Sequence, residues 1–140
     1  MADTMSIQAT FDTEMRFDVT LGSGDKVRFD GMHTAGHSPV EMLLASLAAC
    51  SGISVISILQ KKQEVVTNYE VFAHGVRAET YPLVFLEIDV EHVITGRGVR
   101  KASVERAIEL AETRYCIVSI MLGKATKLTH RYRILEADEK

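Results

Sequence analysis

The two cysteines are the side chains of this sequence best suited to covalent chemistry. Cys50 lies within PVEMLLASLAACSGISVISILQKK (39–62), and Cys116 lies 66 positions later within TRYCIVSIML. A thiolate is a nucleophile, whereas a free cysteine in an apolar segment is more often an inert core residue. On a helix, Ser46, Ser54 and Ser57 would lie along the same stripe as Cys50. Such a stripe lines a pocket or forms a packing groove, and the residues alone leave both interpretations open.

The context of Cys116 also allows two interpretations. If a new helix starts near it, its sulfur lies beside unsatisfied backbone N–H groups and the positive end of the helix dipole. Both features favour the thiolate. If residues 111–122 instead form one continuous helix, Cys116 is a buried core residue of that helix.

Other kinds of site find little support in the sequence. The cysteines are isolated, and His33 and His37 are loop residues four positions apart, so the paired spacings of zinc sites are missing. A Cys–His nucleophile pair fails within one chain, because the helix places His37 roughly 20 Å from Cys50 along its axis. TGRGVR lacks the spacing of a phosphate loop. We therefore expect neither a metal nor a cofactor.

The elements that must position the cysteines follow from periodicity. Alternating apolar and polar residues predict strands, and apolar residues at helical spacing predict helices. Ser38 is the expected N-cap of the long helix, with Pro39 at its first position and Glu41 two residues later. The order predicts an α+β fold in a single domain, residues 1–140. The expected strands are 7–11, 15–21, 26–31, 67–80, 83–95 and 126–135, and the expected helices are 39–62, 99–115 and 116–123.

The long helix predicts a homodimer. Its apolar side chains point in nearly every direction, so it must be buried all round. A chain of 140 residues can cover one side of it, and a second copy is the simplest cover for the other. Each large side chain left in water would forgo roughly 1.5–3 kcal/mol. The apolar side chains are Met42, Leu43, Leu44, Leu47, Ile53, Val55, Ile56, Ile58 and Leu59.

Composition excludes several classes of partner. A net charge of −3 and a pI near 5.9 give no reason to expect nucleic acid. The apolar run 42–59 carries four serines and a glycine and is followed by charges, so we expect no membrane span. The acidic N-terminal segment does not look like a signal peptide. We expect a cytoplasmic protein, in which a disulfide would be catalytic or redox-sensing rather than structural.

Three segments together resemble the OsmC/Ohr family of osmotically inducible and organic hydroperoxide resistance proteins. They are SPVEMLLASLAACSGISVISILQKK, VITGRGVRKASVERAIELAETRYCIVSIML and THRYRI. The helix start SP-x-EM, the helix end SILQK and the motif ITGR are most similar to the YhfA-like branch of the family. The resemblance runs from Phe29 onward and implies an OsmC-like fold. This fold has N-terminal antiparallel strands, a long central helix, further strands, two helices and a final strand, in an intertwined homodimer.

The resemblance also implies a chemistry and its residues. In the peroxidase branches of the family the helix cysteine attacks an organic hydroperoxide and becomes a sulfenic acid. A second cysteine then forms a disulfide with it, which a dithiol reductant resets. The resemblance therefore implies that Cys50 is the nucleophile and Cys116 is the resolving thiol. An arginine of the N-terminal strands, Arg16 or Arg28, and the carboxylate of Glu41 would support the reaction.

Two departures from the family pattern keep a second function open. The first is that neither Arg16 nor Arg28 stands in a recognisable motif, and the second concerns the glutamate. The family glutamate directly follows the helix-start proline, where this chain has Val40, and a one-residue shift rotates a helical side chain by about 100°. The first hypothesis is a thiol-dependent peroxidase that reduces organic hydroperoxides through a Cys50/Cys116 redox pair. The second is a non-catalytic protein that binds a small apolar molecule in the dimer groove. The sequence does not settle whether the protein is an enzyme.

Overall fold

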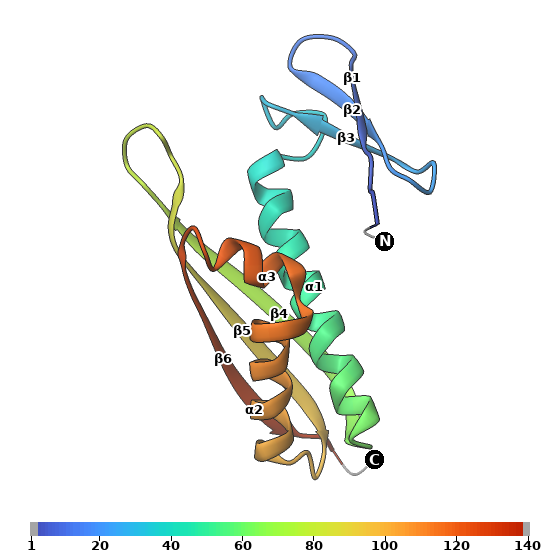
Figure 1. The fold of residues 1–140 in the computed structure, drawn as a ribbon, viewed down its shortest axis with the longest axis vertical. Helices are drawn as coiled ribbons and strands as arrows, with labels where there is room; N and C mark the ends of the chain where they lie inside the picture. Colours follow the sequence, from blue (N-terminus) through green and yellow to red (C-terminus); the bar gives the residue numbers. More distant parts are fainter. Residues whose placement is uncertain (1–2, 139–140) are drawn as a thin grey trace. The chain divides into compact units, whose positions relative to one another are not determined.

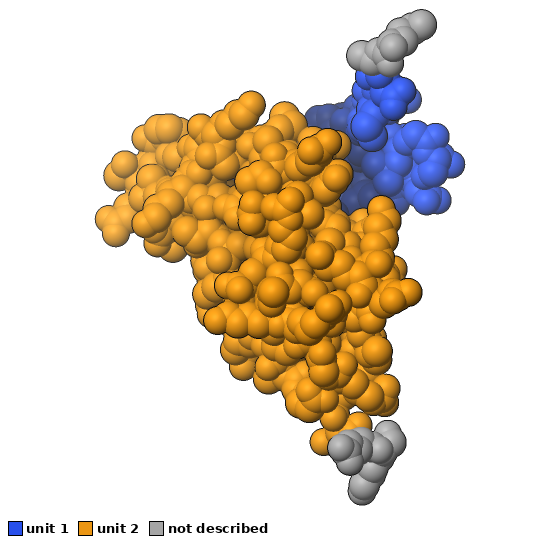
Figure 2. Space-filling view, turned by 60° about the horizontal axis from the view of Figure 1, so that its bottom comes forward, with its two compact units in different colours: residues 1–43 blue, residues 44–140 orange. Residues whose placement is uncertain are grey.

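The computed structural model describes residues 3–138, which form two compact units that meet between Leu43 and Leu44 in the sequence (Figure 2). The elements follow one another in the predicted α+β order (Figure 1). Most bounds agree with the predicted ranges to within about two residues. The elements are β1 Gln8–Phe11, β2 Arg16–Thr20, β3 Lys26–Asp30, α1 Pro39–Lys61, β4 Val65–Arg77, β5 Phe85–Arg97, α2 Lys101–Leu110, a π-helical turn Ala111–Tyr115, α3 Ile117–Leu122 and β6 Lys127–Glu136.

The first unit is an antiparallel meander in the order β1-β2-β3. Its buried carboxylate, Asp30, ends β3 and organises the loop that follows. It accepts hydrogen bonds from the backbone N–H groups of Met32 and Ala35 and from the Thr34 hydroxyl. These bonds hold the pKa of Asp30 well below its usual range. The loop is thereby shaped by one side chain rather than by a hydrophobic contact.

Helix α1 begins and ends at identifiable local signals. The Ser38 hydroxyl accepts a hydrogen bond from the backbone N–H of Glu41 at 3.4 Å, which confirms the predicted N-cap. At the other end Gln63 adopts a left-handed conformation with φ of 61°. The backbone N–H of Glu64 then donates to the carbonyl of Leu59, which closes the helix end.

The second unit is built on a three-stranded sheet in the order β4-β5-β6. Strands β4 and β5 pair antiparallel, and β6 pairs parallel with β5 after the chain has passed through α2 and α3. In Figure 1 the helices α1, α2 and α3 lie on one face of this sheet. The core lies between them, with Ile88, Val90 and Ile94 of β5 fully or almost fully buried.

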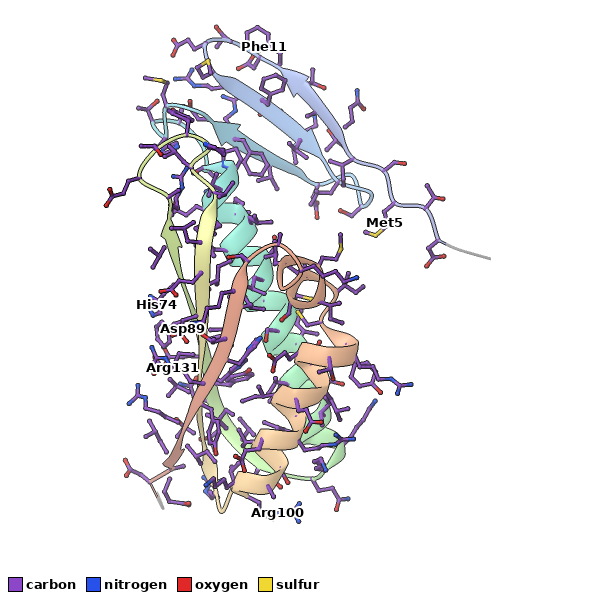
Figure 3. All side chains as sticks on the ribbon, turned by 60° about the vertical axis from the view of Figure 1, so that its left-hand side comes forward. Met5, Phe11, His74, Asp89, Arg100 and Arg131 are labelled. Carbon is purple, nitrogen blue, oxygen red and sulfur yellow. The ribbon has the colours of Figure 1, made fainter. Side chains whose placement is uncertain are left out.

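The opposite face of the sheet is charged. Figure 3 shows His74, Asp89 and Arg131 on the three strands, pointing away from the helices. Arg131 Nε donates to Asp89 at 2.7 Å, and its Nη1 donates to Glu91 at 2.8 Å. The alternation of apolar and charged side chains along the strands therefore separates a helix-covered face from a solvent-facing one.

The part of α1 within the second unit is buried along one stripe. Leu47, Ser51, Val55 and Leu59 repeat every four residues and are fully buried. Ile53 lies off this stripe and is 68% exposed. Among the described residues α1 alone is long and apolar enough to cross a membrane, which is weak evidence because core helices meet the same criterion.

Candidate functional site

The fold brings the two cysteines together. Cys50, in the middle of α1, is half-buried and packs against the core cluster that contains the fully buried Cys116. The two side chains lie close enough for Cys50 to raise the pKa of Cys116, and both cysteines are free thiols. Residues 66 positions apart thus meet where α1 passes the start of α3.

A break between helices creates the position of Cys116. Helix α2 ends at Leu110 and continues as a π-helical turn, after which Cys116 takes an extended conformation with φ of −85° and ψ of 97°. Cys116 is the N-cap of α3, and its sulfur accepts a hydrogen bond from the backbone N–H of Ser119 at 3.4 Å. Of the two interpretations left open by the sequence, the new helix start is confirmed.

The expected consequence of that helix start is wrong. A helix start favours the thiolate, yet the pKa of Cys116 is raised from its ordinary 9.0 to about 11. Burial is the largest cause, and the interaction with the Cys50 side chain is the second. The bonds from the backbone N–H groups of Ser119 and Val118 act in the opposite direction but do not outweigh it. Cys116 is therefore a protonated thiol at neutral pH, and its reaction requires a base.

The other residues expected at the site lie in the first unit and have ionic partners there. Arg16 donates to Asp30 at 3.5 Å and lies 3.6 Å from Glu14. Arg28 makes the stronger bonds, at 2.8 Å to Asp18 and 3.0 Å to Asp12. The pairing with Asp18 raises the pKa of Arg28.

Glu41 occupies the first turn of α1, where its side chain is exposed. Negative charge near a helix N-terminus interacts favourably with the helix dipole. Glu41 can therefore stabilise the start of α1, independently of any role in catalysis.

A buried chain of polar side chains crosses the second unit beside Cys116. The Ser119 hydroxyl lies 3.1 Å from His130 Nε2, His130 Nδ1 lies 3.0 Å from His92 Nε2, and His92 Nδ1 lies 2.6 Å from the Tyr69 hydroxyl. The rings overlap across the sheet, with centroids 5.9 Å apart for Tyr69–His92 and 5.3 Å for His92–His130. Sequence reasoning missed this chain. A signal was present, because both histidines alternate in phase with the apolar residues of their strands.

Burial keeps this chain uncharged. It lowers the pKa of His92 to about 4, with the charge of His130 as a second cause. It also lowers the pKa of His130, although the charges of Glu112 and Asp89 act in the opposite direction. The pKa of Tyr69 is raised above its ordinary 10.0 by burial alone. At neutral pH the chain is thus a row of neutral donors and acceptors.

Helix α1 borders two hollows in the second unit. One, of about 640 Å³, is lined by small and apolar residues of α1 and by Tyr69 and Val71 of β4. The other, of about 480 Å³, is lined by Ser54 and Ser57, among others, and by Tyr115. Part of the serine stripe therefore lines a hollow. Cys50 lies outside both hollows as the described residues define them.

One further polar group lies next to Cys50. The Ser51 hydroxyl, next to Cys50 in the chain, is buried and finds no hydrogen-bond partner among residues 3–138. Within the same residues, no group of three or more histidine, cysteine, aspartate or glutamate side chains is arranged to hold a metal ion. The chemistry that the site offers is therefore that of two adjacent thiols beside a neutral polar chain.

An α+β fold that holds a mid-helix thiol against a second thiol at a later helix start defines a class of two-cysteine proteins. The chain belongs to the OsmC-like family, whose model matches residues 30–131. Protein YhfA of Escherichia coli (strain K12) is 39% identical over 116 residues, covering 82% of this chain and 87% of that protein. The family resemblance predicted from the motifs is confirmed.

Solved structures share the fold. A hypothetical protein from Aquifex aeolicus VF5 has a TM-score of 0.89 at 26% identity, covering 98% of this chain and 100% of that chain. An organic hydroperoxide resistance protein OsmC from Legionella pneumophila has a TM-score of 0.66 at 14% identity, covering 94% of this chain and 98% of that chain. At that identity the second likeness shows the fold alone.

Proposed function

We propose that the protein is a thiol-dependent peroxidase that reduces organic hydroperoxides, with Cys50 as the nucleophile and Cys116 as the resolving thiol. The observation that carries the proposal is that Cys50 packs against the core cluster that contains Cys116, while both cysteines are free thiols. Two thiols that are neighbours in the fold can form a disulfide when their Cβ atoms come within about 3.5–4.5 Å. Membership of the OsmC-like family, and a relative of the same fold named for organic hydroperoxide resistance, support the choice of substrate.

The reaction consumes one hydroperoxide for each pair of thiols. The Cys50 thiolate attacks the terminal oxygen, the O–O bond breaks, and the alkoxide takes up a proton to leave as an alcohol. The Cys116 sulfur then attacks the sulfur of the Cys50 sulfenic acid. An S–S bond forms, hydroxide leaves, and the proton of Cys116 balances it as water. A dithiol reductant returns both cysteines to thiols.

The remaining parts of the proposal concern partners and supporting groups. We place Arg16 and Glu41 in the role of stabilising the Cys50 thiolate and hydroperoxide, with Arg28 as the other candidate arginine. Because Ile53 is 68% exposed on α1, we propose a homodimer in which a second copy covers this face. We further propose that residues 1–140 act as one domain, of which residues 1–2 and 139–140 lie outside the described part. We also propose that the protein is cytoplasmic and has neither nucleic acid nor membrane as a partner.

Titration with cumene hydroperoxide tests the peroxidase proposal. One equivalent of peroxide should consume both thiols of each chain and release cumyl alcohol, and dithiothreitol should restore them. The measurement is free thiol by absorbance together with the mass of the intact protein. Survival of both thiols in excess peroxide would show that the proposal is wrong.

Single cysteine variants assign the two roles. Cys50→Ser should consume no peroxide, because it removes the nucleophile. Cys116→Ser should complete the first step and leave a sulfenic acid at Cys50, which dimedone labels and mass spectrometry locates. If Cys50 remains an unmodified thiol in Cys116→Ser while the native protein forms the disulfide, the roles are reversed.

The apolar hollow supports a second candidate function, the binding of a small apolar molecule without catalysis. Its walls combine small helix residues with the apolar side chains of Ile53, Ile56 and Val71. Uncharged N-phenyl-1-naphthylamine should then bind saturably, with a rise in fluorescence. Ala49→Phe should fill the hollow and abolish the rise. Saturable binding combined with thiols that survive peroxide would favour this function over the peroxidase.

A further inference from the structure

The buried chain Ser119–His130–His92–Tyr69 is continuous from one end to the other. Its three links measure 3.1, 3.0 and 2.6 Å, and each histidine uses both ring nitrogens. His92 is fully buried and Ser119 almost so. The members come from α3, β6, β5 and β4 in that order, so the chain spans the sheet on its helix-covered face. Four polar side chains from four elements thus lie within hydrogen-bonding distance of their neighbours inside an apolar core.

Neutral histidines give such a chain two equivalent arrangements. A neutral imidazole carries one proton, so one of its ring nitrogens donates and the other accepts. In one arrangement Ser119 donates towards His130, His130 towards His92, and His92 towards Tyr69. In the other, every bond runs in the reverse direction. One proton moves along each link when a further proton enters at the Ser119 hydroxyl and another leaves from the Tyr69 hydroxyl. The first arrangement then becomes the second, and all four groups end neutral.

The two ends of this hydrogen-bonded row of side chains lie next to a proton donor and next to a hollow. At the inner end Ser119 is the residue whose backbone N–H already bonds the Cys116 sulfur at 3.4 Å. At the outer end the half-buried Tyr69 lines the apolar hollow beside α1. The chain therefore links the neighbourhood of a buried, protonated thiol with an opening of the core.

We propose that Ser119, His130, His92 and Tyr69 form a proton relay that removes the proton of Cys116 when its sulfur attacks Cys50. The proposal rests on the proposed function in assigning Cys116 as the resolving thiol. The Cys116 proton passes to the Ser119 hydroxyl, and one proton moves along each link to His130, His92 and Tyr69. The Tyr69 hydroxyl proton leaves through the hollow and combines with the hydroxide expelled from Cys50, so that the products are a disulfide and water.

The relay supplies a base for the buried thiol at the moment of its attack, before the hydroxide has left Cys50. Removing a proton from a group with a pKa of about 11 is slow at neutral pH without a nearby acceptor. The charges that act on His130 come from Glu112 in the π-helical turn and Asp89 on the outer face of the sheet. Both favour proton uptake by His130 and so ease the transfer.

The test follows disulfide formation without peroxide. Methyl methanethiosulfonate places a small methylthio group on the half-buried Cys50. Attack by the Cys116 sulfur then breaks the mixed disulfide and expels methanethiolate, which takes up the proton that Cys116 loses and leaves as methanethiol. Acid quench and mass spectrometry give the rate of this second step. At pH 7 we expect Tyr69→Phe and His130→Gln to slow it by about tenfold or more. The deficit should shrink towards zero as the pH rises to 10, because hydroxide replaces the relay.

Two controls separate the relay from a packing defect. Tyr132→Phe removes a tyrosine hydroxyl of β6 that is not part of the relay and should keep the native rate. Cys116→Ser should retain the methylthio group on Cys50. Native rates in both relay variants, or a deficit that persists unchanged to pH 10, would overturn the relay. If His130→Gln does not fold, Tyr69→Phe carries the test, since it keeps the ring.

The same experiment distinguishes the relay from the peroxidase proposal. Thiols that survive excess cumene hydroperoxide would count against the peroxidase alone, because exchange with the methylthio group does not involve peroxide. A pH-dependent deficit in Tyr69→Phe would still support the relay in that case.

Discussion

At the scale of single residues, burial decides the protonation state of the groups around the thiols. The N-cap position of Cys116 favours its thiolate, but loss of hydration outweighs that effect and its pKa rises. The same cause acts with the opposite sign on His92, whose charged form is the protonated one. Both groups are thereby neutral near pH 7.

The lowered pKa of His92 predicts a loss of stability in mild acid. The unfolded chain protonates near pH 6.5, whereas the folded protein does so only near 4. The contribution of neutral His92 to stability is therefore present above pH 6.5 and is lost as the pH falls towards 4. Between pH 7 and pH 5 the free energy of unfolding should fall by on the order of 2 kcal/mol from this group. Urea denaturation at both values measures it.

Histidine variants isolate this effect. His92→Gln should weaken the dependence on pH between 7 and 5, with His130 accounting for part of what remains because its pKa is also lowered by burial. His74→Gln, at an exposed position of the same sheet, should leave the dependence unchanged. An unchanged dependence in His92→Gln would show that the buried pair does not resist protonation.

The unpartnered hydroxyl of Ser51 predicts a stabilising substitution. A buried hydroxyl without a hydrogen bond costs about 1–3 kcal/mol, and alanine is also the better helix former. Ser51→Ala should therefore raise the free energy of unfolding by on the order of 1 kcal/mol, measured by urea denaturation. Ser57→Ala, at a less buried position of α1, is the control and should change stability less. A loss of stability in Ser51→Ala would reveal a partner for the hydroxyl, such as an ordered water.

At the scale of elements, close contacts set the geometry of the sheet. Gly96 of β5 is buried and pairs with Val66 and with Glu136. A Cβ at this position would overlap the carbonyl oxygen of Val65 and approach Val99 Cγ2 to 2.6 Å. A backbone atom cannot move aside as the end of a flexible side chain can, so a Cβ at Gly96 would force β5 away from β4. This explains the glycine of the ITGR motif by sterics.

Gly96→Ala should destabilise the second unit strongly, by several kcal/mol, because the β4–β5 ladder must shift at this point. The matched control is Gly22→Ala, where a Cβ meets nothing within 4 Å. It should be neutral or slightly stabilising, because alanine narrows the conformations of the unfolded chain. Thermal unfolding by circular dichroism compares the two variants. Equal melting temperatures would contradict the steric explanation.

At the scale of the whole molecule, apolar surface is left uncovered in both units. The first unit exposes Phe11 and Phe17, at 59% and 43%, and an apolar hollow of about 470 Å³ includes Phe17 and Phe29. In the second unit Ile53 and Ile117 are 68% and 67% exposed. Exposed apolar patches mark interfaces in soluble proteins. This exposed surface is the physical basis for the proposed homodimer.

A charge on α1 should separate the two copies. Ile53→Lys places an ammonium group in the apolar face, and its desolvation would oppose association. We expect a dimer for the native protein and a monomer for Ile53→Lys at micromolar concentration, measured by size exclusion with light scattering. Ala125→Lys adds the same charge at an exposed turn and should remain dimeric. A native protein that is monomeric would remove the basis for the dimer.

The sequence alone determined the features that depend on local pattern. Periodicity predicted the strands and helices in their observed order, and Ser38 before Pro39 marked the start of α1. The motifs around Cys50 and Cys116 identified the family. These signals work because capping, turn formation and amphipathic spacing involve residues within a few positions of one another. Even at Cys116 local pattern left two alternatives, since a π-helical turn has no clear sequence signature.

Only the tertiary structure decided which distant groups meet. The contact of Cys50 with Cys116 depends on how α1 packs against α3, and the Ser119–His130–His92–Tyr69 chain depends on the register of three strands. A shift of one residue would turn both histidines to the charged face. Burial, which sets the pKa values of Cys116 and His92, is likewise a sum over the whole core. Burial and contacts between distant segments cannot be inferred from neighbouring residues in the sequence. They set the protonation states and the proximity of the groups on which the chemistry of the site depends.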